Sequence, residues 1–416
     1  MSTQNFTEPG DVKVTRLMLF NKDRTAKLSL MPQLISFSVY EDIMCPCLYA
    51  EIELVDAINI VEKFPIVGEE FVEIEFVTPS LPIQAVYSFA VTSVKGSKAD
   101  PNAQSSTYTL VCVSEEQIKS AAKMIQVAGA GTYSEIVKDI LVRELETTKP
   151  IYVEDTKGLM GNVVPKLKPF AAIDYIRQMA VSTKSTTSAF LFFETQLGFQ
   201  FRTIESLMEQ NQGKTAKQFK YVSDVMSTKE GSANAQRNII KYEVISRTDT
   251  IDKIQSGVLN NVVSGYDLIT KELRTTVHNI AEDIKNFVTP DKKARAPLSA
   301  TQYQDYGTKP ADTFFMPFDS SKGGIYRDLT FAARRAYTSL LMQNVTRILI
   351  HGDSALLAGD LIEVEMPSVS SDTGRKKQDT FVSGKYMITR LRHLVVNDVK
   401  IKHMISADII KVGYSV

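Results

Sequence analysis

One strand pattern occurs twice in this chain, once near each end, and it limits what the chain can fold into. Residues 68–76 read GEEFVEIEF, and residues 359–366 read GDLIEVEM. In both segments apolar residues alternate with glutamates, which is the period of a strand that buries one face and exposes the other. The repetition predicts that both ends of the chain contain antiparallel β modules of related design.

The turns around the repeated strand also correspond. One strand ends at Asp56 in the first copy and another at Asp353 in the second, and a loop follows each of them. Gly68 and Gly359, each followed by an acidic residue, then begin the repeated strand. These four residues are therefore predicted to define the repeat.

The likeness continues beyond the repeated strand. Residues 86–95 correspond to residues 384–393, and residues 108–116 correspond to residues 399–408. Any two amphipathic hairpins look alike, so a single match would carry little weight. Four matches in one order predict an internal duplication of a small β-barrel, whose closure leaves no exposed sheet edge.

Between the two copies, the spacing of apolar residues changes from that of a strand to that of a helix. Residues 132–145 place their apolar side chains on one helical face, and Thr132 and Glu135 have the spacing of a capping box. A second helix is predicted at 170–180, and the aromatic segment 188–206 is predicted to form a hairpin. Residues 95–106, rich in Gly, Pro, Asn and Asp, are predicted to form a long hairpin loop.

We therefore predict an α+β fold, mainly β, with two antiparallel barrels at the ends and two smaller α+β domains inserted between them. The predicted domains are a first barrel at 13–115 completed by about 207–246, an α+β domain with a Phe-rich hairpin at 116–206, a linker or second small α+β domain at 247–322 with a polar arm at 289–312, and a second barrel at 323–416.

Composition excludes several function classes. Lys plus Arg and Asp plus Glu number 48 each, so no excess of basic charge favours nucleic-acid binding. The chain has no signal peptide at its start and no apolar run of membrane-spanning length, so we expect synthesis in a cytoplasm and no stable membrane insertion. Cys45, Cys47 and Cys112 with four scattered histidines do not make a zinc site, so no metal and no cofactor is predicted.

Two catalytic readings have limited support. Residues 352–356, GDSAL, resemble an esterase nucleophile block with Ser354 as nucleophile, but the chain has no Asp-x-x-His, so a β-turn is the better interpretation. Strand glutamates about 7 Å apart permit glycosidase chemistry, but no aromatic platform flanks them. His393 and His403 lie on neighbouring strands without a third ligand. No enzyme is predicted, and an esterase or glycan hydrolase using Ser354 or the strand glutamates is the alternative of a different class.

The order of these parts resembles the baseplate hub proteins of contractile-tailed bacteriophages, and is similar to the hub region of the VgrG spike proteins of type VI secretion. The resemblance covers nearly the whole chain. It rests on structural patterns rather than catalytic signatures, and the chain ends at residue 416 without the later domains of VgrG, as in the phage type. The segments that carry it are YAEIELVDAINIVEKFPIVGEEFVEIEF, SAFLFFETQLGFQFRTIESL, VVSGYDLITKEL, LLAGDLIEVEMP and SGKYMITRLRH.

The resemblance implies a structural role in the virion, at the tail baseplate. Three chains with two tail-tube-like barrels each would form a homotrimer that looks nearly six-fold, with a hexameric tail tube above and a trimeric spike below. Other baseplate proteins would contact the outer domains, and DNA would pass through the channel without sequence-specific binding. A phage-derived contractile injection system or a type VI secretion system is the alternative machine.

The charged faces of the repeated strands are candidate lumen residues of such a ring. They would repel DNA phosphates and let the genome slide without sticking. A solvated or packed strand face is the competing interpretation. The four residues are Glu73, Glu75, Glu363 and Glu365.

Overall fold

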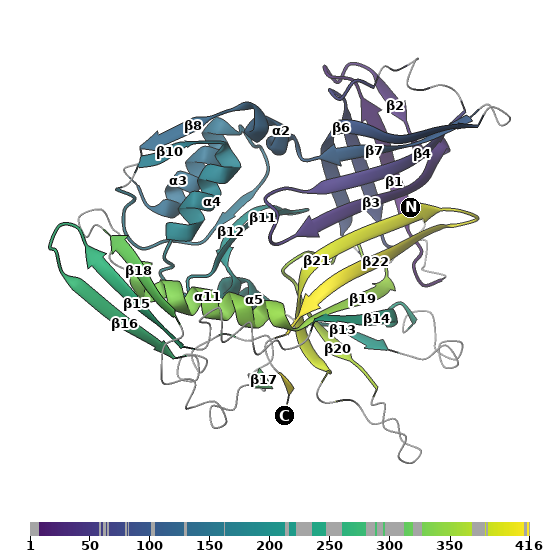
Figure 1. The fold of residues 1–416 in the computed structure, drawn as a ribbon. Coiled ribbons are helices and arrows are strands. Elements are labelled where there is room, and N and C mark those ends of the chain that lie inside the picture. Colours follow the sequence, from purple (N-terminus) through teal and green to yellow (C-terminus); the bar gives the residue numbers. More distant parts are fainter. Residues whose placement is uncertain are drawn as a thin grey trace, which may run out of the picture.

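The structure, a computed structural model, is built around one 13-stranded sheet, with a helical unit packed beside it (Figure 1). It describes residues 8–415 with gaps at 58–59, 61–63, 65, 80, 82, 101–104, 129–130, 162, 213–215, 222–234, 247–259, 280–287, 289–293, 296–311, 319–326, 368–378, 380–381 and 412–413.

Seven strands form the N-terminal sheet, in the order β2-β1-β5-β6-β7-β4-β3 with antiparallel neighbours. The sheet curls, because side chains from both of its margins, such as Leu19 and Phe37, share one core. The strands are β1 (Lys13–Phe20), β2 (Lys27–Ser29), β3 (Leu34–Asp42), β4 (Tyr49–Asp56), β5 (Phe71–Val77), β6 (Gln84–Asp100) and β7 (Ser105–Val113), with a 3-10 turn η1 (Met31–Gln33) before β3.

Six strands close the C-terminal barrel, in the circular order β21-β20-β13-β14-β19-β22. Its core holds Ile348, Val364 and Ile405, all fully buried. The strands are β13 (Lys217–Tyr221), β14 (Asn238–Ser246), β19 (Val345–His351), β20 (Leu361–Glu365), β21 (Gly384–Asn397) and β22 (Ile401–Ile410).

Two sequence predictions about these sheets are wrong. Residues 207–246 do not complete the first barrel, because β13 pairs with β20 and β14 pairs with β19 in the C-terminal barrel, while α5 (Ile204–Gln212) covers the start of that range. Residues 95–106 are not one long loop, because β6 continues to Asp100 and β7 begins at Ser105. Polar residues of an edge hairpin can be solvated on both faces of the strand and still form the backbone ladder. Gly96, with a φ of +68°, lies at a bulge in the β6–β7 ladder.

The α+β unit confirms the predicted helices and hairpin. Thr132 and Glu135 form both hydrogen bonds of the capping box, and Gly198 follows the turn of the aromatic hairpin. The elements are α2 (Glu115–Ala122), β8 (Ile125–Ala128), α3 (Tyr133–Asp139) continued by one π-helical turn η2 (Ile140–Glu144), β9 (Ile151–Val153), β10 (Val163–Leu167), α4 (Pro169–Met179), β11 (Phe190–Thr195) and β12 (Gly198–Thr203).

A third small sheet, β16-β15-β18, projects beside helix α11, which runs toward the barrel (Figure 1). Tyr337 and Leu340 of this helix pack with Leu207 of the α+β unit and Met387 of the barrel. The polar arm predicted at 289–312 lies mostly outside the described residues. The elements are β15 (Asn260–Asp267), β16 (Leu273–Asn279), β17 (Ala294–Arg295), β18 (Asp312–Phe318), α11 (Arg327–Gln343) and β23 (Tyr414–Ser415).

Candidate assembly site at the sheet junction

Strand β21 belongs to both large sheets. Its first part, residues 384–387, pairs with β20 and so closes the barrel. Its second part, residues 390–396, pairs antiparallel with β3, from Arg390 opposite Asp42 to Val396 opposite Ser36. The N-terminal sheet and the C-terminal barrel are therefore joined by a continuous ladder of backbone hydrogen bonds.

Buried polar contacts hold the two sheets together beside this ladder. The Ser354 hydroxyl accepts a hydrogen bond from the Thr78 N–H at 3.1 Å and donates one to the Ile83 carbonyl at 2.9 Å. The Thr78 hydroxyl in turn accepts from the Ser354 N–H at 2.9 Å. Ser354 is fully buried, and its hydroxyl donates to a backbone carbonyl, so it holds the loop between β19 and β20 against Thr78 and Ile83.

Glu41 of β3 connects three units. Its carboxylate accepts hydrogen bonds from the Ala358 N–H at 3.0 Å, in the loop before β20, and from the Gln196 N–H at 2.9 Å, in the β11–β12 turn. The Tyr87 hydroxyl of β6 donates to the same carboxylate at 3.3 Å. Burial raises the pKa of Glu41 to about 7 against the opposing effect of these donors.

A histidine pair packs under the junction. His393 of β21 and His403 of β22 approach through Nδ1 and Nε2 at 3.0 Å, and the Phe76 ring lies edge-on to both, with centroids 5.6 and 5.2 Å away. Burial lowers the pKa of His393 to about 4 and lowers that of His403 well below its usual value. Both rings are therefore neutral at pH 7. In the described part of the chain no three His, Cys, Asp or Glu side chains gather as metal ligands.

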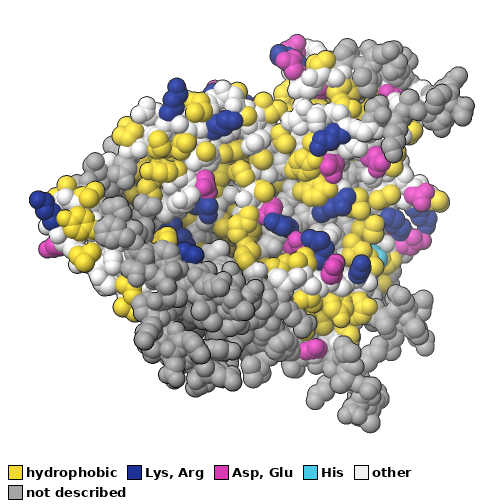
Figure 2. Space-filling view, in the orientation of Figure 1, with side chains coloured by type: hydrophobic (Ala, Val, Ile, Leu, Met, Phe, Trp, Pro, Cys, Tyr) yellow, Lys and Arg dark blue, Asp and Glu magenta, His cyan; other side chains and the backbone are white. Residues whose placement is uncertain are grey.

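The outer surface of the junction carries balanced charge. Arg390 contacts Asp42 at 2.8 Å, and Arg347 forms two hydrogen bonds with Asp408 at 2.7 and 3.0 Å. Arg392 lies over the Tyr40 ring at 5.3 Å. Figure 2 shows both signs of charge mixed along this side rather than a patch of one sign. The paired charges leave this face without a patch of one sign.

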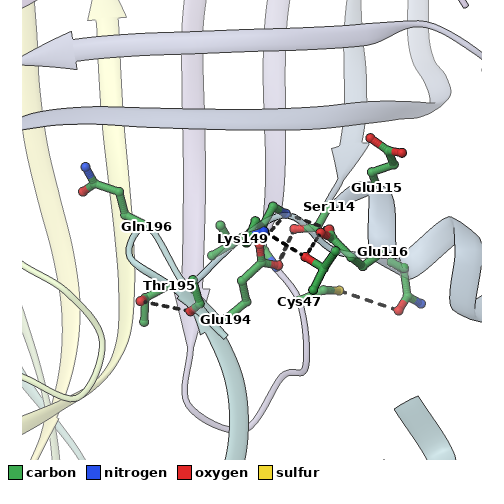
Figure 3. A network of polar contacts seen from close by, with 12 residues as sticks. Cys47, Ser114, Glu115, Glu116, Lys149, Glu194, Thr195 and Gln196 are labelled. Carbon is green, nitrogen blue, oxygen red and sulfur yellow. Dashed lines mark hydrogen bonds and ion pairs between the residues drawn. The ribbon is translucent and has the colours of Figure 1, made fainter. Parts of the chain in front are cut away.

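A second polar cluster attaches the α+β unit to the N-terminal sheet (Figure 3). The Lys149 ammonium lies between Glu116 of α2 and Glu194 of β11, at 2.7 and 2.6 Å. Glu194 also accepts hydrogen bonds from the Ser114 hydroxyl at 2.5 Å and from the Leu48 N–H at 3.1 Å. The cluster fixes the hairpin of one unit against the strand ends of the other.

The three charged groups of this cluster shift one another's pKa. Burial raises the pKa of Glu194, and Lys149 opposes that rise. Burial also acts to raise the pKa of Glu116, but the attraction of Lys149 outweighs it and the pKa falls. Desolvation acts to lower the pKa of Lys149, and the two carboxylates outweigh it and raise the pKa. The lysine therefore stays charged in a mostly buried position.

The four predicted lumen residues are not brought together within one chain. Glu73 and Glu75 lie half-buried on the outer face of β5, where Arg16 contacts them at 2.8 and 3.5 Å. Glu363 accepts a hydrogen bond from Gln218 at 3.0 Å on β20, which also carries half-buried Glu365. Five strands separate β5 from β20 in the sheet order. Their lumen role stays a prediction.

The two predicted turn glycines have the same backbone conformation. Gly68 and Gly359 have φ values of +92° and +93°, just before β5 and β20. Asp56 accepts a hydrogen bond from the Ile60 N–H at 2.6 Å in the loop after β4, and Asp353 accepts one from the Ala355 N–H at 2.9 Å in the loop after β19. Each aspartate therefore caps the loop that follows its strand.

The fold is that of phage tail proteins. A tail protein from Neisseria meningitidis MC58 superposes with a TM-score of 0.55, covering 96% of this chain and 96% of that one. The 43 kDa tail protein of prophage MuSo2 from Shewanella oneidensis gives 0.53, covering 96% and 98%. Sequence identity is 9% in both, so the likeness shows the fold alone.

Other comparisons add little. An E. coli component of the type VI secretion system, c3393, aligns with a TM-score of 0.44 at 9% sequence identity. No protein-family model matches the chain, and no curated protein matches its sequence. The resemblance to tail proteins predicted from the sequence is confirmed at the level of the fold. No helix in the described residues is long and apolar enough to cross a membrane.

Proposed function

We propose that this protein is the structural hub of a contractile-tail baseplate, in which three chains form a ring that looks nearly six-fold. The ring would connect a hexameric tail tube to a trimeric cell-puncturing spike and let DNA pass. The proposal rests on one observation above all: a single chain carries two sheet units of like strand order, joined side by side through β3 and β21.

The strand order supports an internal duplication. The sequence β5-β6-β7-β4 in one sheet corresponds to β20-β21-β22-β19 in the other, and all neighbours are antiparallel. The ladders equate Phe71 opposite Ala90 with Leu361 opposite Met387, so residues 86–95 correspond to 383–392, one residue earlier than the sequence correspondence. They also equate Val111 with Asp408, so Tyr108 corresponds to Ile405 and the sequence correspondence of 108–116 with 399–408 is wrong. Equal register over four strands is harder to explain by chance than alternation alone.

A shared irregularity supports the duplication further. Both β6 and β21 have a bulge two residues beyond that point, at Thr92 and Thr389. Each threonine hydroxyl donates to the carbonyl across the ladder, of Val111 or Asp408, at 3.0 Å. Bulges persist within related structures because they redirect a strand, so a bulge with the same hydrogen bond in each unit is the mark of a copied module.

Two copies of the sheet unit in one chain would suit a protein that connects a six-fold tube to a three-fold spike. A trimer of two-unit chains presents six similar units to a six-fold tube and remains three-fold toward the spike. Contacts around such a ring use two different surfaces, which two diverged copies provide. The α+β unit and the β16-β15-β18 sheet project away from the joined sheets in Figure 1, where other baseplate proteins would meet them.

The chain offers two candidate faces for the bore. One is the predicted glutamate face of β5 and β20, and the other is the outer face of the joined sheet around Arg390, Tyr40 and Glu51. Charge reversal distinguishes them: Glu73→Lys with Glu363→Lys would slow DNA ejection in the first case, and Glu51→Lys would do so in the second. If neither variant changes ejection, no charged face of this chain guides DNA.

Native mass measurement tests the proposal. We expect a complex of about 139 kDa, three times the 46.4 kDa of the chain, alone or with its spike. A monomer that stays monomeric beside the tube and spike proteins contradicts the trimer. The alternative machine, a contractile injection or type VI secretion apparatus, predicts the same trimer, and neighbouring capsid and terminase genes distinguish a virus from it.

A further inference from the structure

The aromatic hairpin of β11 and β12 belongs to two hydrophobic cores. Phe193 of β11 packs in one core with Leu361 and Met387 of the C-terminal barrel. The neighbouring Phe192 lies in the other core, against Phe170 of α4 inside the α+β unit. Alternate side chains of a strand point to opposite faces, so the hairpin forms the wall between these cores. A movement of the α+β unit against the joined sheets must therefore displace this hairpin.

A buried carboxyl group lies at each end of the hairpin. At the tip, Glu41 of β3 accepts a hydrogen bond from the Gln196 N–H at 2.9 Å. At the base, Glu205 belongs to helix α5, which follows β12 directly, and its carboxyl group accepts a hydrogen bond from the Thr186 hydroxyl at 3.3 Å. The two glutamates are 1% and 2% exposed, so both carboxyl groups are withdrawn from water.

The surroundings of Glu41 favour its protonated form. Besides two backbone N–H groups, it faces the Tyr87 hydroxyl of β6, at 3.3 Å, and Asp360 in the loop before β20. Asp360 is itself acidic, and among the described residues no cation forms an ion pair with Glu41. An ionised carboxyl group without a cation is costly to remove from water, so burial raises the pKa of Glu41 to about 7.

Glu205 has surroundings of the same kind. It faces the hydroxyl groups of Thr186 and Thr187, and the charged side chain that acts on it is Glu154, just after β9. Burial raises the pKa of Glu205 to about 7, and the negative charge of Glu154 adds to this rise. Burial, with the nearby charge of Glu205, also raises the pKa of Tyr337 of α11, so that phenol stays neutral. In the described part of the chain Glu205 forms no ion pair either.

We propose that the hairpin is a pH-sensitive joint, in which Glu41 at the tip and Glu205 at the base bind protons as the pH falls from 8 to 6 and so hold the α+β unit more tightly against the joined sheets. The sign follows from linkage. A carboxyl group whose folded pKa is raised from 4.5 to about 7 contributes stability that is fully present below pH 4.5 and is lost as the pH rises through 7. The inference goes beyond the proposed function and does not require the ring.

Hydrogen exchange of the full chain tests this inference. The protection of a peptide covering 190–203, corrected for the pH dependence of intrinsic exchange, is compared at pH 6 and pH 8. Each carboxyl group changes the opening equilibrium by about tenfold between these pH values, because it is protonated at pH 6 in the closed joint and ionised in the open one. Glu41→Gln and Glu205→Gln each keep the size of the side chain and remove its proton-binding site. Each substitution is expected to lower the ratio of protection at pH 6 to protection at pH 8 by about tenfold, and both together by about a hundredfold.

Controls separate these carboxyl groups from other titrating groups. The buried histidines act in the opposite sense, since burial lowers the pKa of His351, His393 and His403. They are the same in wild type and variants, so the difference between the proteins isolates the two carboxyl groups. Glu363→Gln, at a half-buried position on β20, is the matched control and is expected to keep the wild-type ratio. A peptide covering 13–20, in β1, is the internal reference.

A protection ratio that agrees within about threefold between wild type and the double variant overturns the inference. Infrared spectroscopy of the wild type gives a second measurement, which does not depend on the stability of any variant. At pH 6 the wild type is expected to show the carbonyl stretch of buried, protonated carboxyl groups, and at pH 8 this band is expected to disappear. A wild-type spectrum without that change overturns the inference as well. Neither result bears on the trimer, which native mass measurement decides.

Discussion

A substitution of Lys149 tests how the α+β unit is attached to the N-terminal sheet. Lys149 is the only cation that contacts both Glu116 and Glu194 within the described residues, and these carboxylates are 6% and 1% exposed at their side chains. Lys149→Met keeps the aliphatic stem and removes the charge. Breaking a buried ion pair from one side costs about 3–5 kcal/mol, because a charge is left buried without a partner.

The loss of stability is expected to be local, at the contact between the α+β unit and the N-terminal sheet. Hydrogen exchange measured on peptides covering 44–56 and 190–203 is expected to speed up by roughly two to four orders of magnitude, which is the same energy expressed as a rate ratio. A peptide covering 401–410 in the C-terminal barrel is the internal reference and is expected to change little.

Two further variants control this experiment. Lys149→Met with Glu194→Gln removes the more deeply buried of the two carboxylates that lose Lys149, and is expected to recover part of the protection. Lys119→Met breaks an exposed pair with Glu115 and is expected to cost less than about 1 kcal/mol. A Lys149→Met variant that loses less than about tenfold protection, or loses it equally in the barrel, refutes the view that this cluster joins the two units.

Three other expectations concern the junction and the turns. Acid unfolding should reflect His393: its pKa of about 4 lies below the ordinary 6.5, so stability falls by about 3 kcal/mol as pH drops from 6.5 to 4. Glu41, whose pKa is raised to about 7, acts in the opposite sense, because its protonation stabilises the fold as pH falls from 7 to 4.5. Unfolding free energies of wild type and His393→Gln should therefore be compared by denaturant titration at each pH. Equal slopes of this free energy against pH in the two proteins would refute the role of the histidine. Gly68→Ala and Gly359→Ala should each cost about 1–2 kcal/mol in thermal unfolding, since both glycines have positive φ, and a large inequality would argue against equivalent turns. Ser354→Ala should leave ester and cell-wall substrates unaffected while costing about 1–3 kcal/mol from unpaired buried groups, and an activity present in wild type and lost in this variant would restore the enzyme alternative.

Local pattern predicted local structure well. The alternation around Ile74 and Val364 follows from side chains pointing to opposite faces of a strand, and both residues are fully buried as that alternation requires. The capping box at Thr132 and Glu135 is likewise encoded within four residues. Such features need no knowledge of the rest of the chain.

Strand partners could not be predicted in the same way. The alternation of apolar and polar residues in β13 and β14 shows which face of each strand is buried, but not which strands pair with them. The sequence-based assignment of these residues to the first barrel was wrong for that reason. The junction between β3 and β21 was likewise invisible, since it joins residues about 350 positions apart. Edge pairing is decided by the whole fold.

The buried acids that organise the interfaces left a signal that sequence reasoning missed. Glu41 has the same phase along β3 as Phe37 and Val39, so alternation points its side chain inward. Glu194 stands at the end of the aromatic run of β11, where all six residues are buried. A charged residue at an apolar phase indicates a buried hydrogen-bonding role, because burial without partners is costly.

The most direct test of the whole account is an electron cryo-microscopy reconstruction of the assembled particle at strand resolution. We expect six sheet units around one channel, contributed by three chains, with β3 and β21 of each chain adjacent. Six units drawn from six separate chains, or two units of one chain that do not share a ring, would contradict it.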